Sequence, residues 1–457
     1  MSIFQITGGK RLRGTVAASG SKNAALPMMA ASILADGPVL LKGVPWLADV
    51  DTLSSVLREL GVEVSRSDAG LTLETVDTAP IRARYDLVRR MRAGFCVLGP
   101  LLARRGRAVV SLPGGCNIGD RPVDLHLKGL AALGARLRLR HGYVIARAGR
   151  LAGATIDLDG PRGPTVTGTA NVVSAAVLAK GETLITGAAV EPEIVDLCGF
   201  LNAMGARISG LGTPTIRVEG VERLDNVARL GGVAYRVIPD RIEAATLLLA
   251  VAITGGSATV TGVVPGHMSG VLSVLRAAGS RIETGVDRVT IAAAGRPLPI
   301  DVAARPYPGV PTDVQAQLTA LACVARGQST VRDDVFVNRF MHVAELNRLG
   351  ARIRRRGRGV VITGVRRLTA AAVTASDLRA SAALVIAALA AEGQSVVRRA
   401  HHLDRGYQRL DEKLNRLGAR IERKRSPFAD TITQPTEESN HGGNRHEEPQ
   451  RQGMVEG

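Results

Sequence analysis

The chain has 457 residues, of which 45% are hydrophobic and only 3% are aromatic. At roughly 100–200 residues per domain, this length predicts two or three domains with cores built mainly from Ala, Val, Leu and Ile. Lys and Arg number 59 against 41 Asp and Glu, a net charge of +18. This balance excludes an acidic solvating protein and favours phosphorylated or acidic partners, with nucleic acid as one candidate.

The sequence gives no indication of a membrane span, an export signal or a disulfide framework. The nearest apolar segments, Ala244–Ile253 and Ala382–Ala391, are about half the length that a bilayer requires. The N-terminus lacks the apolar stretch of a signal peptide. The cysteines show no CxxC pairing, which argues against a zinc site; they are Cys96, Cys116, Cys198 and Cys323. We therefore expect a cytoplasmic location, no membrane partner and no metal.

One pattern recurs along the chain: an amphipathic segment ends in an apolar residue, Gly and a small or apolar residue, and a short strand-like run follows. The glycines are Gly61, Gly134, Gly205, Gly279, Gly350 and Gly418, separated by 73, 71, 74, 71 and 68 residues. Each is expected just after a helix end, where positive φ carries no Cβ penalty. Ala-rich helices precede them, for example over Ala244–Ala252 and Gln315–Ala325, with strands such as Glu182–Thr186 between. The spacing predicts repeated units of about 70 residues that pack against one another.

The first motif that suggests chemistry is Ser19-Gly20-Ser21-Lys22-Asn23-Ala24-Ala25, between a predicted strand over Gly14–Ala18 and an Ala-rich helix. A helix start offers unpaired N–H groups to an anion, and Lys22 would add a full charge. The spacing is not that of a P-loop. A capped helix with a solvated lysine is an equally good interpretation of this segment alone.

The second motif is a loop, Leu112–His126, with the sequence LPGGCNIGDRPVDLH. Its glycines and prolines exclude a helix or strand interior. Cys116 lies within it, close in sequence to Arg121, which would lower the thiol pKa and make Cys116 a nucleophile or general acid. An inert loop cysteine is the alternative.

The third motif, Pro311-Thr312-Asp313, precedes an apolar helix. Either side chain would serve as an N-cap, which is the favoured interpretation from this motif alone. A general base for a substrate hydroxyl is the functional alternative for Asp313.

Several arginines lie beside predicted turns or caps, and a planar guanidinium suits phosphate or carboxylate. They are Arg92, Arg379 and Arg405. Together they suggest a polyanionic small ligand. Arg352–Arg358 instead alternates along a strand and is expected to form a solvated basic face, with a nucleic-acid patch as the alternative. The absence of interleaved aromatic residues argues against single-strand stacking.

The C-terminal segment differs from the rest. From Arg425 onward the chain is polar and carries six acidic and three basic residues. We expect residues 426–457 to form a disordered polar tail.

Several segments together resemble the UDP-N-acetylglucosamine 1-carboxyvinyltransferase family of enolpyruvyl transferases. The similarity is collinear from about Phe4 to Glu422 and rests on SGSKNAALP, SLPGGCNIGDRPVDLHLKGL, EPEIVDL, RVIPDRIEA, PTDVQAQ, NRFMHVAEL, SDLRAS and LDRGYQRLDEKL. The resemblance implies an α/β fold, a two-domain inside-out α/β barrel built from six repeated units of about 70 residues. Residues 22–238 would form one domain, with the Cys-bearing loop, and residues 1–21 and 239–425 the other.

The resemblance also implies an activity and a site. The family transfers the enolpyruvyl group of phosphoenolpyruvate to the 3-hydroxyl of UDP-N-acetylglucosamine and releases phosphate, the first committed step of peptidoglycan synthesis. Cys116 matches the general acid, Asp313 the base, and Lys22 a catalytic cation. The positions matching phosphoenolpyruvate contacts are Lys22, Asn23, Arg121 and Arg405. The positions matching UDP-sugar contacts are Asn23, Arg92, Arg121, Pro122, Val123, Asp124, Leu125, Asp313 and Val335. No cofactor, metal or nucleic acid is implied, and we expect a monomer.

One segment departs from the family pattern. Where a Ser-Val-Gly-Ala-Thr-Glu-Asn-like stretch is expected near the uridine, the chain has Thr165-Val166-Thr167-Gly168-Thr169-Ala170-Asn171, so that Ala170 replaces the usual acid. An enolpyruvyl transferase acting on another uridine nucleotide, such as UMP, is therefore an alternative. A basic RNA-binding repeat protein is a second alternative, which would explain the charge but not the positions of Cys116, Asp313 and Lys22.

Overall fold

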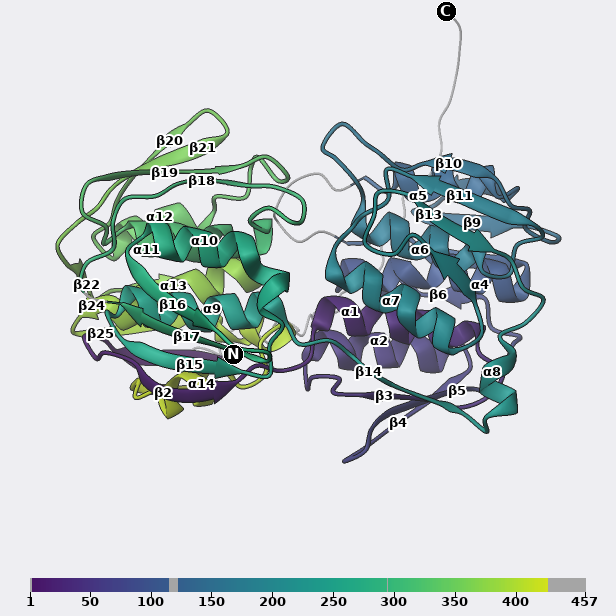
Figure 1. The fold of residues 1–457 in the computed structure, drawn as a ribbon, viewed down its shortest axis with the longest axis horizontal. Coiled ribbons are helices and arrows are strands. Elements are labelled where there is room, and N and C mark those ends of the chain that lie inside the picture. The colour runs from purple at the N-terminus through teal and green to yellow at the C-terminus, as the bar shows by residue number, and fades with distance from the viewer. Residues whose placement is uncertain (1, 115–121, 294, 426–457) are drawn as a thin grey trace, which may run out of the picture.

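The computed structural model describes residues 2–114, 122–293 and 295–425. It forms two lobes that lie side by side (Figure 1), each with its own hydrophobic core. The core of the first lobe is built from residues between Ala24 and Val237. The core of the second lobe combines N-terminal residues, from Phe4 to Val16, with residues from Ile242 to Ile421. The chain therefore starts in the second lobe, builds the first and returns.

Each lobe contains three four-stranded sheets, and all six sheets have the same topology. The first strand pairs in parallel with the second, and the remaining pairings are antiparallel. In the first lobe the orders are β14(Val233–Arg236)-β3(Val39–Lys42)-β5(Gly70–Thr75)-β4(Val62–Ser67), β6(Arg82–Ala83)-β7(Arg107–Ser111)-β9(Tyr143–Arg147)-β8(Arg136–Arg140) and β10(Thr155–Asp157)-β11(Glu182–Thr186)-β13(Ile216–Glu219)-β12(Arg207–Ser209).

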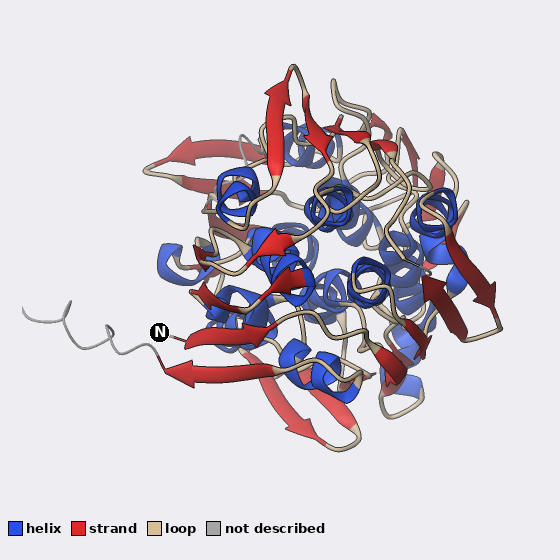
Figure 2. Ribbon diagram, turned by 90° about the vertical axis from the view of Figure 1, so that its left-hand side faces the viewer, coloured by secondary structure: helices blue, strands red, loops and turns tan. Residues whose placement is uncertain are grey.

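The second lobe repeats this arrangement. Its orders, written in the same direction, are β2(Arg13–Ala17)-β15(Ser257–Thr261)-β17(Arg288–Ala293)-β16(Ser280–Thr284), β18(Asp301–Ala304)-β19(Gln328–Asp333)-β21(Gly359–Thr363)-β20(Arg352–Arg356) and β23(Ala372–Thr374)-β25(Gln394–Arg398)-β1(Ser2–Thr7)-β26(Ile421–Arg425). A short parallel pair, β22(Leu368–Thr369) and β24(Ala391–Glu392), lies outside these sheets. In Figure 2, which faces the second lobe, strands lie at the outside and helices in the interior.

Helices buried on nearly all sides form the centre of each lobe: α1(Lys22–Ala31) and α6(Val166–Ala176) in the first, and α9(Arg241–Ile253), α11(Gln315–Ala322) and α13(Leu378–Ala390) in the second. Their small, apolar sequences suit such burial, because Ala lets helices approach closely and the apolar side chains leave water. The other helices are α2(Ala48–Glu59), α3(Tyr85–Val88), α4(Leu98–Arg105), α5(Asp124–Ala132), α7(Pro192–Ala203), α8(Asp225–Arg229), α10(Ser269–Ala277), α12(His342–Arg348) and α14(Leu410–Arg416), with 3₁₀ turns η1(Ser32–Leu34), η2(Arg92–Val97), η3(Pro265–Met268), η4(Thr312–Val314) and η5(Ala400–Arg405).

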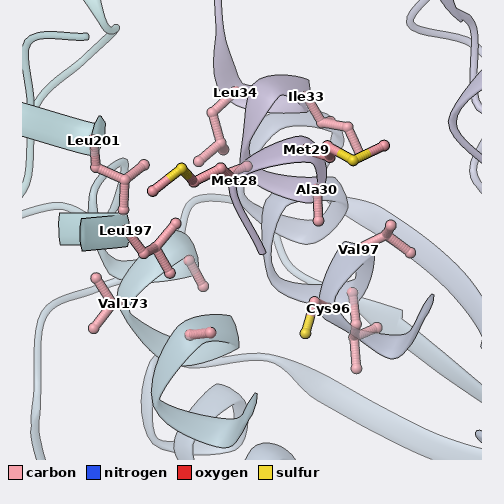
Figure 3. Packing of buried hydrophobic residues seen from close by; sticks show 14 of the residues in the cluster. Met28, Met29, Ala30, Ile33, Leu34, Cys96, Val97, Val173, Leu197 and Leu201 are labelled. Atoms are coloured by element: carbon pink, nitrogen blue, oxygen red, sulfur yellow. The ribbon is translucent and has the colours of Figure 1, made fainter. Parts of the chain in front are cut away.

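Helix α1 shows how the first core is filled. Its residues Met28 and Met29 are fully buried, and Leu197 and Leu201 of α7 lie beside Met28, as Figure 3 shows. Unbranched methionine side chains adapt to irregular gaps between helices.

The six predicted helix ends are confirmed. Helices α2, α5, α7, α10, α12 and α14 each end two residues before one of the repeated glycines. All six glycines have positive φ, from 77° at Gly61 to 110° at Gly205. This is the left-handed conformation that only glycine adopts without strain.

Two short segments cross between the lobes and pair with each other. The backbone N–H of Ser21 donates to the carbonyl of Ile238 at 2.7 Å, and that of Asp240 donates to Ser19 at 2.8 Å. A Cβ at Gly20 would lie 1.9 Å from a backbone oxygen, so this close approach requires glycine. Among the described residues, no helix is long and apolar enough to cross a bilayer.

Candidate active site

A cleft of about 1010 Å³ is lined by residues of both lobes. The N-terminal ends of several helices reach it: Lys22 begins α1, Asp124 begins α5, and Arg241 begins α9. Asp313, in η4, and Arg405, the last residue of η5, also line the cleft. Helix starts favour anions, so the cleft combines helix dipoles with basic side chains.

Asp49 joins two of the predicted cations across the two lobes. Its carboxylate accepts from Nζ of Lys22 at 3.1 Å and from Nε of Arg405 at 2.9 Å. Burial opposes ionisation of Asp49, but Lys22 and Arg405 outweigh it and lower the pKa of the carboxyl. The side chain of Ser21 caps α1 by accepting from the N–H of Ala24. Lys22 is therefore a buried, paired side chain, and not the solvated lysine of the alternative interpretation.

Asp313 is paired with two arginines from different elements. Its Oδ1 lies 2.8 Å from Nη1 of Arg339, and its Oδ2 lies 2.8 Å from Nη2 of Arg379. Burial works against the charge, but Arg379 and Arg339 outweigh it and hold the pKa of Asp313 well below its usual value. A quarter of the Asp313 side chain is exposed toward the cleft. The interpretation of Thr312 or Asp313 as an N-cap is wrong, because neither side chain caps η4 or α11.

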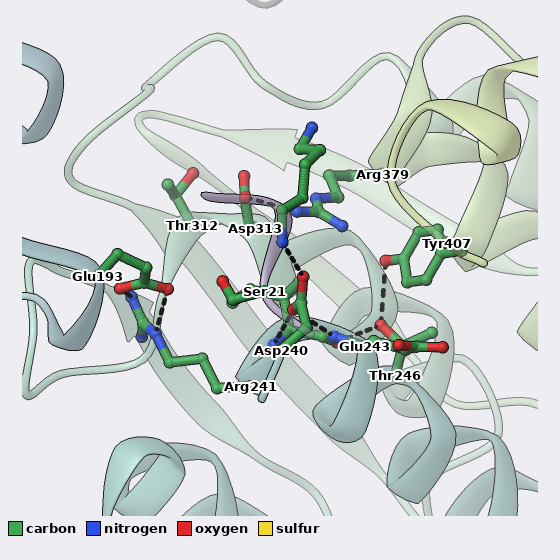
Figure 4. Close-up of polar contacts among 12 residues, drawn as sticks. Ser21, Glu193, Asp240, Arg241, Glu243, Thr246, Thr312, Asp313, Arg379 and Tyr407 are labelled. Atoms are coloured by element: carbon green, nitrogen blue, oxygen red, sulfur yellow. Dashed lines mark hydrogen bonds and ion pairs between the residues drawn. The ribbon is translucent and has the colours of Figure 1, made fainter. Parts of the chain in front are cut away.

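Arg379 is held from behind by a buried polar network (Figure 4). Its guanidinium lies 5.2 Å from the ring centroid of Tyr407. The Tyr407 hydroxyl is 3.0 Å from Oγ1 of Thr246 and accepts from Nε2 of Gln317 at 3.1 Å. Thr246 of α9 and Gln317 of α11 thus hold Tyr407 in place, and Tyr407 packs against Arg379 of α13. This packing fixes the guanidinium beside Asp313.

The segment that departs from the family pattern forms the start of α6 and lies against α5. Thr165 caps the helix, and Thr167 Oγ1 lies 3.1 Å from Nε2 of His126. The other ring nitrogen of His126 lies 2.9 Å from Nδ2 of Asn171. Burial, with a smaller contribution from Arg92, lowers the pKa of His126 to about 3. The histidine is therefore a neutral link that positions this wall of the cleft, where Ala170 contributes only a methyl group.

A second charged group connects the lobes, next to the second crossover. Arg241 forms a two-point ion pair with Glu193, at 2.9 and 3.1 Å. The Arg241 guanidinium also lies 5.4 Å from the ring centroid of Tyr307. Glu191 lies close by with one buried carboxylate oxygen that has no hydrogen-bond partner, and burial raises its pKa. Figure 4 shows Glu193 and Arg241 facing each other.

The structure brings most of the predicted site residues together. Those that line the cleft are Lys22, Asn23, Arg92, Pro122, Asp124, Leu125, Asp313, Val335 and Arg405, together with Arg379. Val123 immediately precedes α5 but is not part of the lining. Cys116 and Arg121 lie outside the described residues. The basic face predicted over Arg352–Arg358 is confirmed as the exposed strand β20 and its turn, away from the cleft lining.

Sequence reasoning missed several charged residues of the cleft, including four that form its ion pairs: Asp49, Glu193, Arg241 and Arg339. Three of them lie inside segments that carried the resemblance, EPEIVDL, RVIPDRIEA and NRFMHVAEL. The sequence around Asp49 did not indicate a functional role, because an acidic residue in the first turn of a helix is common. Among the described residues, no three His, Cys, Asp or Glu side chains are grouped as metal ligands would be.

Comparison with known proteins agrees with this geometry. Residues 6–414 match the family model for EPSP synthase (3-phosphoshikimate 1-carboxyvinyltransferase). The chain is 52% identical over 431 residues to a UDP-N-acetylglucosamine 1-carboxyvinyltransferase of Anaeromyxobacter sp., covering 93% of this chain and 100% of the relative. It is 50% identical over 425 residues to UDP-N-acetylglucosamine 1-carboxyvinyltransferase 2 of Carboxydothermus hydrogenoformans, covering 93% and 99%.

Solved structures share the fold. The enolpyruvyl transferase NikO from Streptomyces tendae superposes with a TM-score of 0.83 at 28% identity, covering 93% of this chain and 99% of that one. An EPSP synthase from Acinetobacter baumannii superposes with a TM-score of 0.70 at 19% identity, covering 93% and 100%, and shows the fold alone. The mixed α/β architecture, the family model and the two relatives agree, and the chain belongs to the UDP-N-acetylglucosamine 1-carboxyvinyltransferase family of enolpyruvyl transferases.

Proposed function

We propose that the protein transfers the enolpyruvyl group of phosphoenolpyruvate to the 3-hydroxyl of UDP-N-acetylglucosamine and releases phosphate. The observation that supports this most directly is the pairing of cations and carboxylates across one cleft. Lys22 and Arg405 meet at Asp49, and Arg339 and Arg379 meet at Asp313. A substrate that carries both phosphate and carboxylate needs several cations at once. The relatives that are about half identical to this chain are named for this reaction.

In the proposed mechanism, Lys22, Asn23, Arg121 and Arg405 hold phosphoenolpyruvate. Arg92, Pro122, Val123, Asp124, Leu125 and Val335, together with Asn23, Arg121 and Asp313, contact the nucleotide sugar. Cys116 supplies a proton to the methylene carbon, which leaves an oxocarbenium-like centre at C2. The sugar hydroxyl bonds to C2 while Asp313 accepts its proton. The Cys116 thiolate then takes a proton from the methyl group of the tetrahedral intermediate as the C–O bond to phosphate breaks, which restores the double bond and the thiol.

The ion pairs of Asp313 with Arg339 and Arg379 determine when this carboxylate can act as a base. A carboxylate held by two guanidiniums is ionised but weakly basic. If a substrate anion engages Arg339 or Arg379, the carboxylate loses part of that stabilisation and its pKa rises toward the range useful for proton transfer. We propose that nucleotide-sugar binding activates Asp313 in this way. Exclusion of water from the closed cleft would strengthen the remaining charge contacts.

The finer architecture belongs to the same proposal. We assign six repeated units to a two-domain inside-out α/β barrel, with residues 22–238 as one domain, residues 1–21 and 239–425 as the other, and residues 426–457 as a tail. Six four-stranded sheets of identical topology and two separate cores support the assignment. A monomer in the cytoplasm is the proposed working form.

One observation favours an alternative acceptor, another uridine nucleotide such as UMP. Ala170 replaces the acid expected beside the uridine and contributes only a methyl group to the cleft wall. Phosphate release from phosphoenolpyruvate should therefore be measured with UDP-N-acetylglucosamine, with UMP, with shikimate 3-phosphate and with no acceptor. Release with the UDP-sugar alone supports the proposal. Release with UMP alone would reassign the acceptor. If folded protein released no phosphate with any acceptor, the proposed reaction would be refuted.

A further inference from the structure

The sheet β6-β7-β9-β8 has one buried and one exposed face. Ala108, Val110, Val144 and Ala146 face the core and are at most 1% exposed. The opposite face carries six exposed arginines, here called the arginine face: Arg82, Arg107, Arg136, Arg138, Arg140 and Arg147.

Strand register arranges these arginines in two dimensions. Arg147 on β9 lies directly opposite Arg107 on one side and Arg136 on the other. In the next row, Arg82 and Arg138 stand at the two ends, separated by an apolar residue on each intervening strand. Neighbouring strands are about 4.8 Å apart, and alternate residues along a strand about 6.7 Å apart. The six charges therefore form a two-dimensional lattice and not a single stripe.

Within the part of the chain that the structure describes, no acidic side chain pairs with the arginine face. None of its six guanidiniums forms a salt bridge with another described residue. The four strands of this sheet contain no Asp or Glu, whereas each of the other five four-stranded sheets contains at least one. Arginines on several of those sheets are paired, for example Arg217 with Glu182 at 2.7 Å and Arg281 with Glu283 at 2.8 Å.

Protection of a sheet edge does not account for this pattern. Basic residues on an edge strand do discourage edge-to-edge aggregation, and β8 is such an edge. However, Arg107 and Arg147 lie on the two interior strands β7 and β9, where no edge needs protection. Like charges directly opposite each other also destabilise a sheet. Because this arrangement of charges disfavours folding, we expect the arginine face to bind an anionic partner that offsets the repulsion.

We propose that the arginine face is a docking surface for an anionic phospholipid bilayer. A two-dimensional lattice of cations can contact several headgroups at once, and each arginine near such a surface adds about 1 kcal/mol of attraction. One exposed residue with an apolar body adjoins the face: Tyr85, 50% exposed after β6, whose backbone N–H donates to the hydroxyl of Tyr143 at 3.1 Å. An exposed Tyr beside basic residues is typical of surfaces that rest in the membrane interface.

Nucleic acid fits the face less well. Non-specific binding of a strand relies on aromatic side chains that stack with bases. The one aromatic residue within the arginine face, Tyr143, is half-buried, and Arg82 covers its ring at 4.8 Å. No membrane partner was expected because the sequence lacks spanning helices and an export signal. An exposed basic sheet face without paired acidic residues instead indicates binding at the membrane surface, which does not require those features.

The test uses the full chain and vesicle sedimentation. Vesicles of phosphatidylcholine, alone or with about 30% phosphatidylglycerol, are mixed with protein at low and at physiological ionic strength. The variant Arg107→Gln/Arg136→Gln/Arg147→Gln removes three charges of the arginine face. The matched control, Arg352→Gln/Arg354→Gln/Arg356→Gln, removes three exposed charges from the edge strand β20 in the other lobe. Thermal midpoints show that both variants fold.

We expect the wild type to sediment with anionic vesicles only, and binding to weaken with salt. The arginine-face variant should bind about 100-fold more weakly, and the β20 variant should bind within a few-fold of wild type. Tyr85→Ser should weaken binding further without changing its salt dependence. Equal losses in both triple variants would overturn the proposal, because binding would then reflect net charge alone. Retention on a duplex of about 30 base pairs without vesicle sedimentation would overturn it in favour of nucleic acid.

Discussion

Oδ2 of Asp313 lies 2.8 Å from Nη2 of Arg379, so the proposed base and a buried guanidinium form one charge pair. Arg379 is fixed by Tyr407 behind it. The acidity of Asp313 is therefore controlled by side chains that belong to the fold of the second lobe, and not by the solvent in the cleft. Changes to either arginine should appear as changes in the pH dependence of the reaction.

Arg379→Gln should move the acid limb of the kcat/KM profile to higher pH. In the wild type, Arg379 and Arg339 hold the pKa of Asp313 well below its usual value, so the carboxylate stays ionised across the neutral and mildly acidic range. Removal of one cation raises that pKa, and activity at acidic pH is lost earlier. Arg379→Lys keeps the charge and should move the limb less. An acid limb that stays in place in Arg379→Gln would contradict the assignment of Asp313 as the base.

Asp313→Asn should lower kcat by about 10²–10⁴-fold, the usual contribution of a positioned base, with a smaller change in KM for the nucleotide sugar. Stability should fall as well, because Arg339 and Arg379 lose their common partner in a buried setting. Loss of one member of a buried pair commonly costs about 3–5 kcal/mol, an upper bound here since Asp313 is partly exposed.

The control for that experiment is Asp334→Asn, which removes a carboxylate paired with Arg305 at 3.2 Å on an exposed site near the cleft. It should leave kcat within a few-fold of wild type, because exposed pairs contribute little. A normal kcat in Asp313→Asn, with reduced stability, would show that Asp313 has only a structural role.

The sequence predicted the repeat well because the physical cause is local. A helix that turns into a strand needs one residue at positive φ, and the six spaced glycines mark those points without knowledge of the tertiary structure. The charge pairs could not be predicted in this way. Asp49 and Arg405 are 356 positions apart, and only the return of the chain to the second lobe brings them together. The favoured N-cap for Asp313 failed for the same reason, since distant arginines compete for its oxygens.

Acid should destabilise the protein partly through Asp49. Its pKa is lowered in the folded state, so its contribution is fully present above the unfolded value of about 3.9 and is lost as pH falls through the folded pKa. Asp49→Asn should therefore lower the free energy of unfolding at neutral pH and lessen its decline below about pH 4. Urea unfolding between neutral and acidic pH checks this. A parallel decline in the variant and the wild type would show that other carboxylates dominate acid unfolding.

Cysteine labelling separates the loop thiol from the other three. Burial raises the pKa of Cys96, Cys198 and Cys323 to about 12, so at pH 8 only about one in 10⁴ of each is thiolate. Iodoacetamide should therefore add one equivalent to the folded protein, at Cys116, and none to Cys116→Ser. Mass spectrometry of the intact chain counts the adducts, and the same variant should lose most phosphate release. Labelling that persists in Cys116→Ser would place the reactive thiol elsewhere, and labelling of all four residues at once would indicate that the protein had unfolded.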